Sequence, residues 1–310
     1  MKNLTVGLFH DEELGKDLGK KGSETDIIMF NRKTDGCIFT FMQPVKGKLS
    51  AKSQIMSCID FAIISFTGLT HEVGETVIML DSFGISKGII LSPPYADTSQ
   101  IEKIIKDTSL KSFVIIERDV AKIFELLQKV DPKRVVDTSP VVVIDQAFSV
   151  KGVGEVLLGF VKKGTLKKHD KLSLMPTNKE VIVRSIQMQD KNFDEAEAGS
   201  RVGLAIKGAA AEEMKRGFFI CAPEDCEVST KLTLSFEKNK FYPGELQEGL
   251  FHVTAGMQTV PAKIADMKEN TITLELEKQI VYTKDDTFLL LDLNAKKLHV
   301  IGKGRAVKTS

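Results

Sequence analysis

The sequence has few cysteines, no long apolar stretch and almost no net charge, and each of these absences excludes a class of protein. Four cysteines in 310 residues are too few for a disulfide framework. No stretch approaches the ~20 apolar residues of a transmembrane helix, and the apolar run near the start is too short for a signal peptide. The 43 basic residues nearly balance the 42 acidic ones, so no overall charge indicates binding to DNA or a membrane, although a local patch would suffice for RNA. We therefore expect a cytoplasmic protein with no membrane partner and no DNA partner.

The cysteines and histidines do not indicate a metal site or a catalytic site. Cys221 and Cys226 lie close enough in the sequence to pair with each other or to bind a metal. No second cysteine pair or group of histidines accompanies them, so we expect reduced thiols and no metal. The histidines are scattered, and none lies near a serine or cysteine in a pattern typical of nucleophilic catalysis. No catalytic residue is predicted.

Residues 1–137 alternate between short apolar runs and helical periodicity, which together predict an α/β sheet covered by helices. A turn signal at residues 34–36 joins two of the strands in a hairpin. The strands are expected at residues 4–9, 26–31, 37–42, 61–66, 88–91 and 112–116. Two helices are predicted from shared apolar faces, one with Ile101, Ile104 and Ile105, the other with Val120, Ile123, Leu126 and Leu127.

After residue 137 the pattern changes to short strands that are punctuated by glycines, which is typical of small β-barrels. A second boundary falls near Pro223, so we expect one barrel in residues 138–224 and another in 225–310. Strands of the first are expected at residues 141–144, 155–161, 171–175, 181–187 and 202–206. Strands of the second are expected at residues 231–236, 250–254, 271–277, 287–292 and 297–302. The predicted fold class is therefore an α/β domain followed by two β-barrels.

Three segments of the middle domain resemble translational GTPases of the elongation factor Tu family. Residues 144–164 read IDQAFSVKGVGEVLLGFVKKG, and in that family the second domain opens with Phe-Ser-Ile, a Gly-x-Gly turn and Gly-x-Val-x-x-Gly. Residues 198–204, AGSRVGL, are similar to the family's Ala-Gly-x-x-Val-Gly, and residues 215–217 end on its Arg-Gly. The resemblance extends over the whole chain in the three-domain form of the archaeal and selenocysteine-specific factors. It implies that residues 1–137 are a P-loop-type G domain with a mostly parallel sheet.

The phosphate loop that this resemblance implies is poorly preserved. The loop needs Gly-x-x-x-x-Gly-Lys-Ser/Thr, because glycines let backbone N–H groups cradle phosphates and the hydroxyl holds Mg²⁺. Residues 10–17 read HDEELGKD, so Gly15 and Lys16 remain, whereas Asp17 replaces the hydroxyl residue. Three acidic residues, at positions 11–13, would also face the phosphates, and each like-charge pair at ~4 Å costs roughly 1–4 kcal/mol. We hypothesise that these carboxylates occupy the place of the phosphate at the helix start.

The other nucleotide motifs of the family also depart from the pattern. Residues 42–45, MQPV, stand where the family has Asp-x-x-Gly, and Lys46 stands at its catalytic histidine. Residues 92–95, SPPY, replace the base-reading Asn-Lys-x-Asp, although Asp97 follows two residues late. Residues 117–118, Glu-Arg, replace the Ser-Ala pair, and the segment between residues 16 and 26 is too short for a long switch loop. We therefore expect a pseudo-GTPase with no cofactor. The alternative is an atypical GTPase that binds GTP and Mg²⁺ through Gly15, Lys16 and Asp17.

For RNA binding, the candidates are lysines of the first barrel and one arginine. Lys162, Lys163, Lys167 and Lys168, with Lys171, form the densest basic cluster, which could contact RNA phosphates or lie on a solvated turn. The resemblance implies that the family's pocket for the end of tRNA corresponds to Gln187, Asp190 and Arg201. An acidic residue replaces the family's arginine there.

These observations favour a non-catalytic relative of elongation factor Tu that binds tRNA, the ribosome or another translation factor. An atypical GTPase is one alternative. A protein-interaction scaffold without RNA binding is the other.

Overall fold

The computed structural model describes residues 2–243, 246 and 249–307, and they fall into two compact units. One unit consists of Met1–Pro132 together with Asn294–Val300, and the other of Lys133–Leu293 together with Ile301–Ser310. The first unit contains the α/β domain, and the second contains both barrels.

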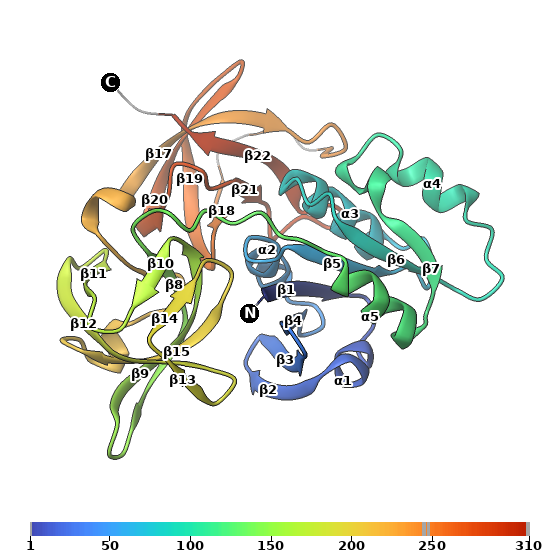
Figure 1. The fold of residues 1–310 in the computed structure, drawn as a ribbon. Coiled ribbons are helices and arrows are strands. Elements are labelled where there is room, and N and C mark those ends of the chain that lie inside the picture. Colours follow the sequence, from blue (N-terminus) through green and yellow to red (C-terminus); the bar gives the residue numbers. More distant parts are fainter. Residues whose placement is uncertain (1, 244–245, 247–248, 308–310) are drawn as a thin grey trace. The chain divides into compact units, whose positions relative to one another are not determined.

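A seven-stranded sheet forms the centre of the first unit, in the order β2-β3-β4-β1-β5-β6-β7 (Figure 1). Strands β4, β1, β5, β6 and β7 are mutually parallel, whereas β3 is antiparallel to both β2 and β4. The strands are β1 (Lys2–Phe9), β2 (Lys20–Glu24), β3 (Ile27–Thr34), β4 (Cys37–Pro44), β5 (Phe61–Ser65), β6 (Gly88–Ser92) and β7 (Val114–Glu117). The helices are α1 (Leu14–Leu18), α2 (Leu49–Met56), α3 (His71–Ser82), α4 (Ser99–Ile105), η1 (Ser109–Ser112) and α5 (Val120–Gln128).

Helices cover this sheet because its central strands are apolar on both faces. All five residues of β5 and of β6 are buried, which is typical of parallel strands. The longer helices begin at polar caps: Thr70 accepts a hydrogen bond from the Val73 amide, and Asp119 accepts two in α5. One face packs against α1 and α5 in a cluster that includes Leu4, Leu8, Leu14, Leu18, Ile63, Ile123 and Leu127.

The segment Asn294–Val300 belongs to the first unit although it leads into a strand of the last barrel that begins at Val300. Within that unit, the buried carboxylate of Glu75 in α3 accepts a hydrogen bond of 2.7 Å from the His299 amide. The same carboxylate oxygen lies 2.9 Å from Nδ1 of the His299 ring. This pair connects α3 to the chain segment that enters the last strand.

The predicted strands of the α/β domain are confirmed within a few residues, and two details need correction. Ser112 was expected in a strand but lies in η1, and β7 begins at Val114. Ile104 was expected on the buried face of its helix, but its side chain is 40% exposed, because Ile101 and Ile105 alone face the core. Strand β2 was not predicted, because its KKGSE sequence has no apolar pattern.

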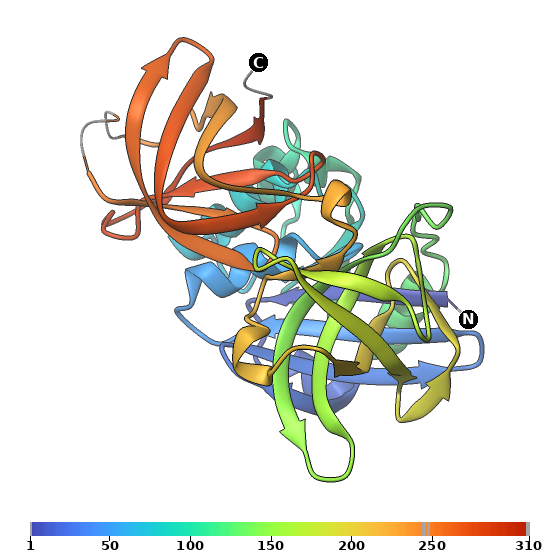
Figure 2. The ribbon, with the colours of Figure 1, turned by 90° about the vertical axis from the view of Figure 1, so that its left-hand side faces the viewer.

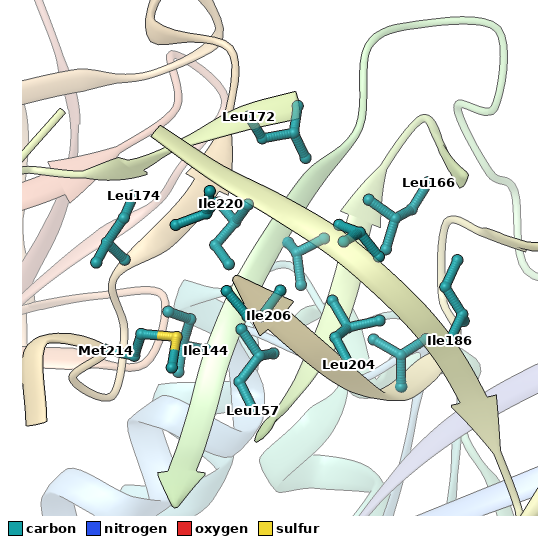
Figure 3. Packing of buried hydrophobic residues seen from close by; sticks show 14 of the residues in the cluster. Ile144, Leu157, Leu166, Leu172, Leu174, Ile186, Leu204, Ile206, Met214 and Ile220 are labelled. Carbon is teal, nitrogen blue, oxygen red and sulfur yellow. The ribbon is translucent and has the colours of Figure 1, made fainter. Parts of the chain in front are cut away.

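The first barrel closes through six strands in the order β11-β16-β8-β9-β15-β12, with β12 pairing back to β11 and β13 adding to the edge. Figure 3 shows its interior, where Ile144, Leu157, Leu204 and Ile206 point toward one another. The long hairpin of β8 and β9 extends beyond the barrel body (Figure 2). The strands are β8 (Val141–Val150), β9 (Gly154–Lys163), β10 (Thr165–Lys167), β11 (Lys171–Met175), β12 (Lys179–Met188), β13 (Lys191–Phe193), β14 (Glu195–Glu197), β15 (Arg201–Lys207) and β16 (Phe219–Cys221), with short helices η2 (Ala211–Glu213) and η3 (Pro223–Asp225).

The last barrel closes in the order β17-β20-β19-β18-β21-β22, so both expected barrels are confirmed. Its strands are β17 (Glu227–Lys238), β18 (Phe251–Ala255), β19 (Gln258–Lys268), β20 (Thr271–Tyr282), β21 (Phe288–Leu291) and β22 (Val300–Ala306). Strand β19 was missed because Pro261 and several charged residues interrupt its apolar alternation. Residues 297–299 were expected in the last strand, but that strand begins at Val300.

Candidate functional site

The loops at the carboxyl ends of β1, β4, β6 and β7 lie at one edge of the parallel sheet. Open α/β sheets bind their ligands at this edge. The predicted remnant of a phosphate loop, Gly15, Lys16 and Asp17, lies here in helix α1, which follows β1 after a loop of four residues. The structure therefore places the predicted residues where a nucleotide site is expected.

Asp11 uses the first free amide groups of α1. Its Oδ1 atom accepts hydrogen bonds from the amides of Glu13 at 3.1 Å and Leu14 at 3.0 Å. These N–H groups at a helix start are the groups that bind phosphate oxygens in phosphate loops. In this chain, a carboxylate accepts the hydrogen bonds of both amides.

Arg118 joins two carboxylates of the same loop. The residue follows β7, and its Nε lies 2.8 Å from Asp11 Oδ2 while its Nη2 lies 2.5 Å from Asp17 Oδ2. The hydrogen bonds to Asp11 and then to Asp17 raise the pKa of the Arg118 guanidinium. The position expected to hold Mg²⁺, Asp17, is therefore paired with an internal cation.

Lys16 and Gly15 make contacts that serve the fold. Lys16 pairs at 2.8 Å with Glu13 of the same loop, and its side chain is 61% exposed. A Cβ atom added to Gly15 would lie only 2.3 Å from the Phe30 ring. Close packing against Phe30 therefore accounts for the glycine at this position.

Another carboxylate joins two loops on the side of the sheet where members of the family recognise the guanine base. Glu117 Oε1 accepts a hydrogen bond of 3.1 Å from the Tyr95 amide. Tyr95 has φ of 59° and a side chain that is 99% exposed. Asp97 accepts hydrogen bonds from the amide and hydroxyl of Ser99 at 3.0 and 2.9 Å, so it closes a local turn before α4.

A partly buried polar group lies behind the loop and was not found from the sequence. His10 Nε2 lies 2.8 Å from the Thr76 hydroxyl, which also accepts a hydrogen bond of 3.3 Å from Lys52. Burial lowers the pKa of His10 to about 4, with a further contribution from Lys52. Burial also lowers the pKa of Lys52. His10 directly follows β1, Lys52 lies in α2 and Thr76 in α3, and no sequence spacing links them.

The structure divides the predicted lysine cluster into two groups. Lys162 forms an ion pair with Asp286 of the last barrel, and Lys163 pairs with Asp225 at 3.1 Å. Lys167 and Lys168 are exposed at the end of β10. Lys162 thus contacts the last barrel, Lys163 contacts the short helix η3 that leads to it, and the second two lysines are exposed.

Arg201, the remaining RNA-binding candidate, lies in a partly buried ion-pair network. Its Nη2 lies 3.2 Å from the buried Asp145 carboxylate, which also pairs with Arg216 at 3.2 Å. The guanidinium lies 5.8 Å from the centre of the Phe160 ring. Burial lowers the pKa of Arg201. This network gives the partly buried charge of Arg201 a carboxylate partner.

The expected tRNA-end pocket is built on a tight hairpin. Strands β12 and β13 pair from Met188 to Lys191, which leaves a turn of two residues, Gln189 and Asp190. Their φ values of 49° and 58° are those of the turns favoured in short hairpins. Gln187 donates a hydrogen bond of 3.0 Å to Asn192. The side chain of Gln187 therefore has a partner within the hairpin.

Two features that the described residues lack concern metals and membranes. Among residues 2–243, 246 and 249–307, no group of three or more histidines, cysteines, aspartates or glutamates could hold a metal ion. Within the same residues, no helix has both the length and the apolar character that crossing a bilayer requires.

This fold, a mostly parallel G-domain-like sheet followed by two six-stranded barrels, is that of three-domain elongation factors. Residues 154–221 match the family model of elongation factor Tu domain 2. A selenocysteine-specific elongation factor of Methanocaldococcus jannaschii is 31% identical, over 99% of this chain and 80% of its own length. The chain therefore belongs to the elongation factor Tu-like family of translational GTPases.

Two further comparisons concern the full length of the chain. An uncharacterised protein of M. jannaschii is 36% identical over 98% of this chain and 100% of its own length. The crystal structure of translation elongation factor SelB from Methanococcus maripaludis, in complex with the GTP analogue GppNHp, superimposes with a TM-score of 0.84 at 24% identity, over 100% of this chain and 80% of that one. The match to the M. jannaschii selenocysteine factor runs over 375 residues, 65 more than the 310 of this chain, so that factor contains segments with no counterpart here.

Proposed function

We propose that this protein is a non-catalytic member of its family that binds the translation machinery without a competent GTP site. The observation that carries the proposal is the set of contacts around Asp11. This carboxylate occupies two helix-start amides, and Arg118 joins it to Asp17. The proposed location is the cytoplasm, where the translation machinery is found.

The residues present do not fit GTP with Mg²⁺. A triphosphate would have to displace Asp11 from the amides of Glu13 and Leu14 while two neighbouring carboxylates repelled it. Lys16 would have to leave Glu13. On the base side, Glu117 and the turn formed by Asp97 replace the groups that read guanine in the family. We therefore expect no GTP hydrolysis by this chain.

A role in translation is supported by the family and by the two barrels, which retain the family's architecture. The partner is proposed to be tRNA, the ribosome or another translation factor. For an RNA partner, Lys167 and Lys168 are the best-placed candidates, because Lys162, Lys163 and Arg201 are engaged in ion pairs. Contacts of exposed lysines with phosphates release counterions, so such binding should weaken steeply with salt.

A binding assay tests this proposal. Purified protein is titrated against ribosomes and against aminoacylated and uncharged tRNA at several salt concentrations. We expect saturable binding to at least one of these, weaker for Lys167→Gln/Lys168→Gln than for the control variant Lys278→Gln/Lys284→Gln on the other barrel. Both control lysines are exposed. Equally weakened binding in both variants would reject this RNA-contact site. Absence of binding to tRNA and ribosomes would favour a protein-interaction scaffold.

A further inference from the structure

Two thiols meet at the connection between the two barrels. Cys221 ends β16 of the first barrel, and Cys226 directly precedes β17 of the second. The short helix η3 (Pro223–Asp225) turns the chain between them and brings the two Sγ atoms within 3.5 Å of each other. Both cysteines are free thiols in the structure.

The surroundings keep the two sulfur atoms together. Cys221 is held in the sheet, where it pairs with Ser173 of β11. On the other side, Asp225 is bound by Lys163 of β9 at 3.1 Å, which fixes the residue before Cys226. A disulfide bond requires its sulfurs to approach to about 2.05 Å, so a movement of roughly 1.5 Å closes the gap. A side-chain rotation supplies a movement of that size without unfolding a strand.

The two cysteines differ in their access to solvent and in the direction of their pKa shifts. Cys221 is fully buried, whereas Cys226 is partly exposed. The Cys221 thiol donates a hydrogen bond to the Cys226 sulfur. This hydrogen bond lowers the pKa of Cys226 and raises the pKa of Cys221. An accessible cysteine of lowered pKa beside a buried thiol is the arrangement of an attacking cysteine with a resolving partner.

We propose that Cys221 and Cys226 are a redox modification site, at which a small-molecule disulfide oxidises the pair to an intramolecular disulfide across the barrel connection. The Cys226 thiolate attacks one sulfur of the disulfide RSSR, so that a mixed disulfide forms and RS⁻ leaves. The Cys221 thiol then gives up its proton, and its sulfur attacks the Cys226 sulfur and expels the second RS⁻. Two electrons pass from the protein to RSSR, and the two leaving groups become RSH at neutral pH.

The site has a direct test because both cysteines lie in one tryptic peptide, residues 217–231, between Arg216 and Lys231. The full chain is incubated with oxidised glutathione or with buffer alone, then unfolded, alkylated and digested. In the untreated sample the peptide should carry two alkyl groups. After oxidation the peptide should carry no alkyl group. Its mass should be that of the reduced, unalkylated peptide minus two hydrogens. Cys37 and Cys58 lie in other peptides and should keep their alkyl groups.

Single variants separate the roles of the two cysteines. In Cys221→Ser the proposed attacking cysteine has no resolving partner, so Cys226 should accumulate as a stable mixed disulfide with glutathione. In Cys226→Ser the buried Cys221 should stay reduced and become alkylated after unfolding. Cys58→Ser, a control at another partly exposed cysteine, should behave as the wild type. Retention of both alkyl groups in the oxidised wild-type peptide would overturn the proposal, as would glutathione on Cys58 in preference to Cys226.

Discussion

At the residue scale, the edge of the α/β sheet is organised by charges that neutralise one another. Asp11 and Asp17 are joined through Arg118, and Lys16 is joined to Glu13. From the sequence we hypothesised that the acidic run takes the place of phosphate. The hydrogen bonds from two helix-start amides to Asp11 are consistent with that hypothesis. Its partner Arg118 could not be predicted, because 107 residues separate the two and only the folded sheet brings them together.

Replacement of Asp11 should destabilise the protein far more than replacement of its neighbour Glu12. Asp11→Ala removes two helix-start hydrogen bonds and the pair with Arg118, for an expected loss of about 1–2 kcal/mol. Glu12 is an exposed residue 3.8 Å from Lys46, so Glu12→Ala should cost less than about 0.5 kcal/mol. Unfolding in denaturant measures both values. Equal stability of the two variants would contradict the role given to Asp11.

His10 should make the protein less stable in mild acid. The pKa of His10 is lowered from 6.5 to about 4 in the folded state by burial and then by Lys52. The unfolded chain therefore takes up the proton first, and stability should fall as the pH drops from about 6.5 toward 4. Each unit of pKa difference corresponds to about 1.4 kcal/mol in the free energy of unfolding. Because the ring is partly exposed, screening by solvent reduces this value.

A variant isolates this effect. His10 has a φ of 65°, a conformation that asparagine tolerates, so His10→Asn should fold and lose stability less steeply between pH 6.5 and 4. The control is His71→Asn, because His71 is exposed at the start of α3. Melting temperatures across this pH range measure the slopes. An unchanged slope in His10→Asn would assign the acid sensitivity to other groups.

At the scale of elements, apolar strands could be predicted from the sequence and polar or short elements could not. Strands β5 and β6 are continuous buried apolar runs, and the expected ranges match them closely. Helix α1 has only five residues, and Gly19 alone separates it from β2. The sequence indicated that this segment was too short for a long switch loop. It did not indicate that an edge strand, β2, takes that place, because an exposed edge strand needs no apolar alternation.

Two glycines in helices should respond in opposite ways to replacement by alanine. In α1, a Cβ at Gly15 would lie 2.3 Å from the Phe30 ring, so Gly15→Ala should destabilise the protein by roughly 1–3 kcal/mol. In α3, a Cβ at Gly74 would meet no described atom within 4 Å apart from its own helix, so Gly74→Ala should stabilise by about 0.5–1 kcal/mol. Thermal unfolding distinguishes the two signs. A neutral Gly15→Ala would mean that packing does not require this glycine.

At the scale of the whole molecule, the chain has the family's three-part architecture, whereas its nucleotide edge carries an internal ion-pair network. In the family, the phosphate state of a bound nucleotide orders or releases switch segments. A chain that binds no nucleotide lacks that signal. We therefore expect its domain arrangement to be indifferent to GTP and GDP, and small-angle scattering curves recorded with either nucleotide should coincide with the curve of the free protein.

Calorimetric titration with GTP and with GDP, in the presence of Mg²⁺, tests the central claim most directly. The Methanococcus maripaludis factor, crystallised with the GTP analogue GppNHp, is the positive control. For this protein we predict no saturable heat of binding up to millimolar concentrations of GTP or GDP. Saturable binding at micromolar nucleotide, lost in Lys16→Ala, would contradict the account and establish a rebuilt GTP site around Gly15, Lys16 and Asp17.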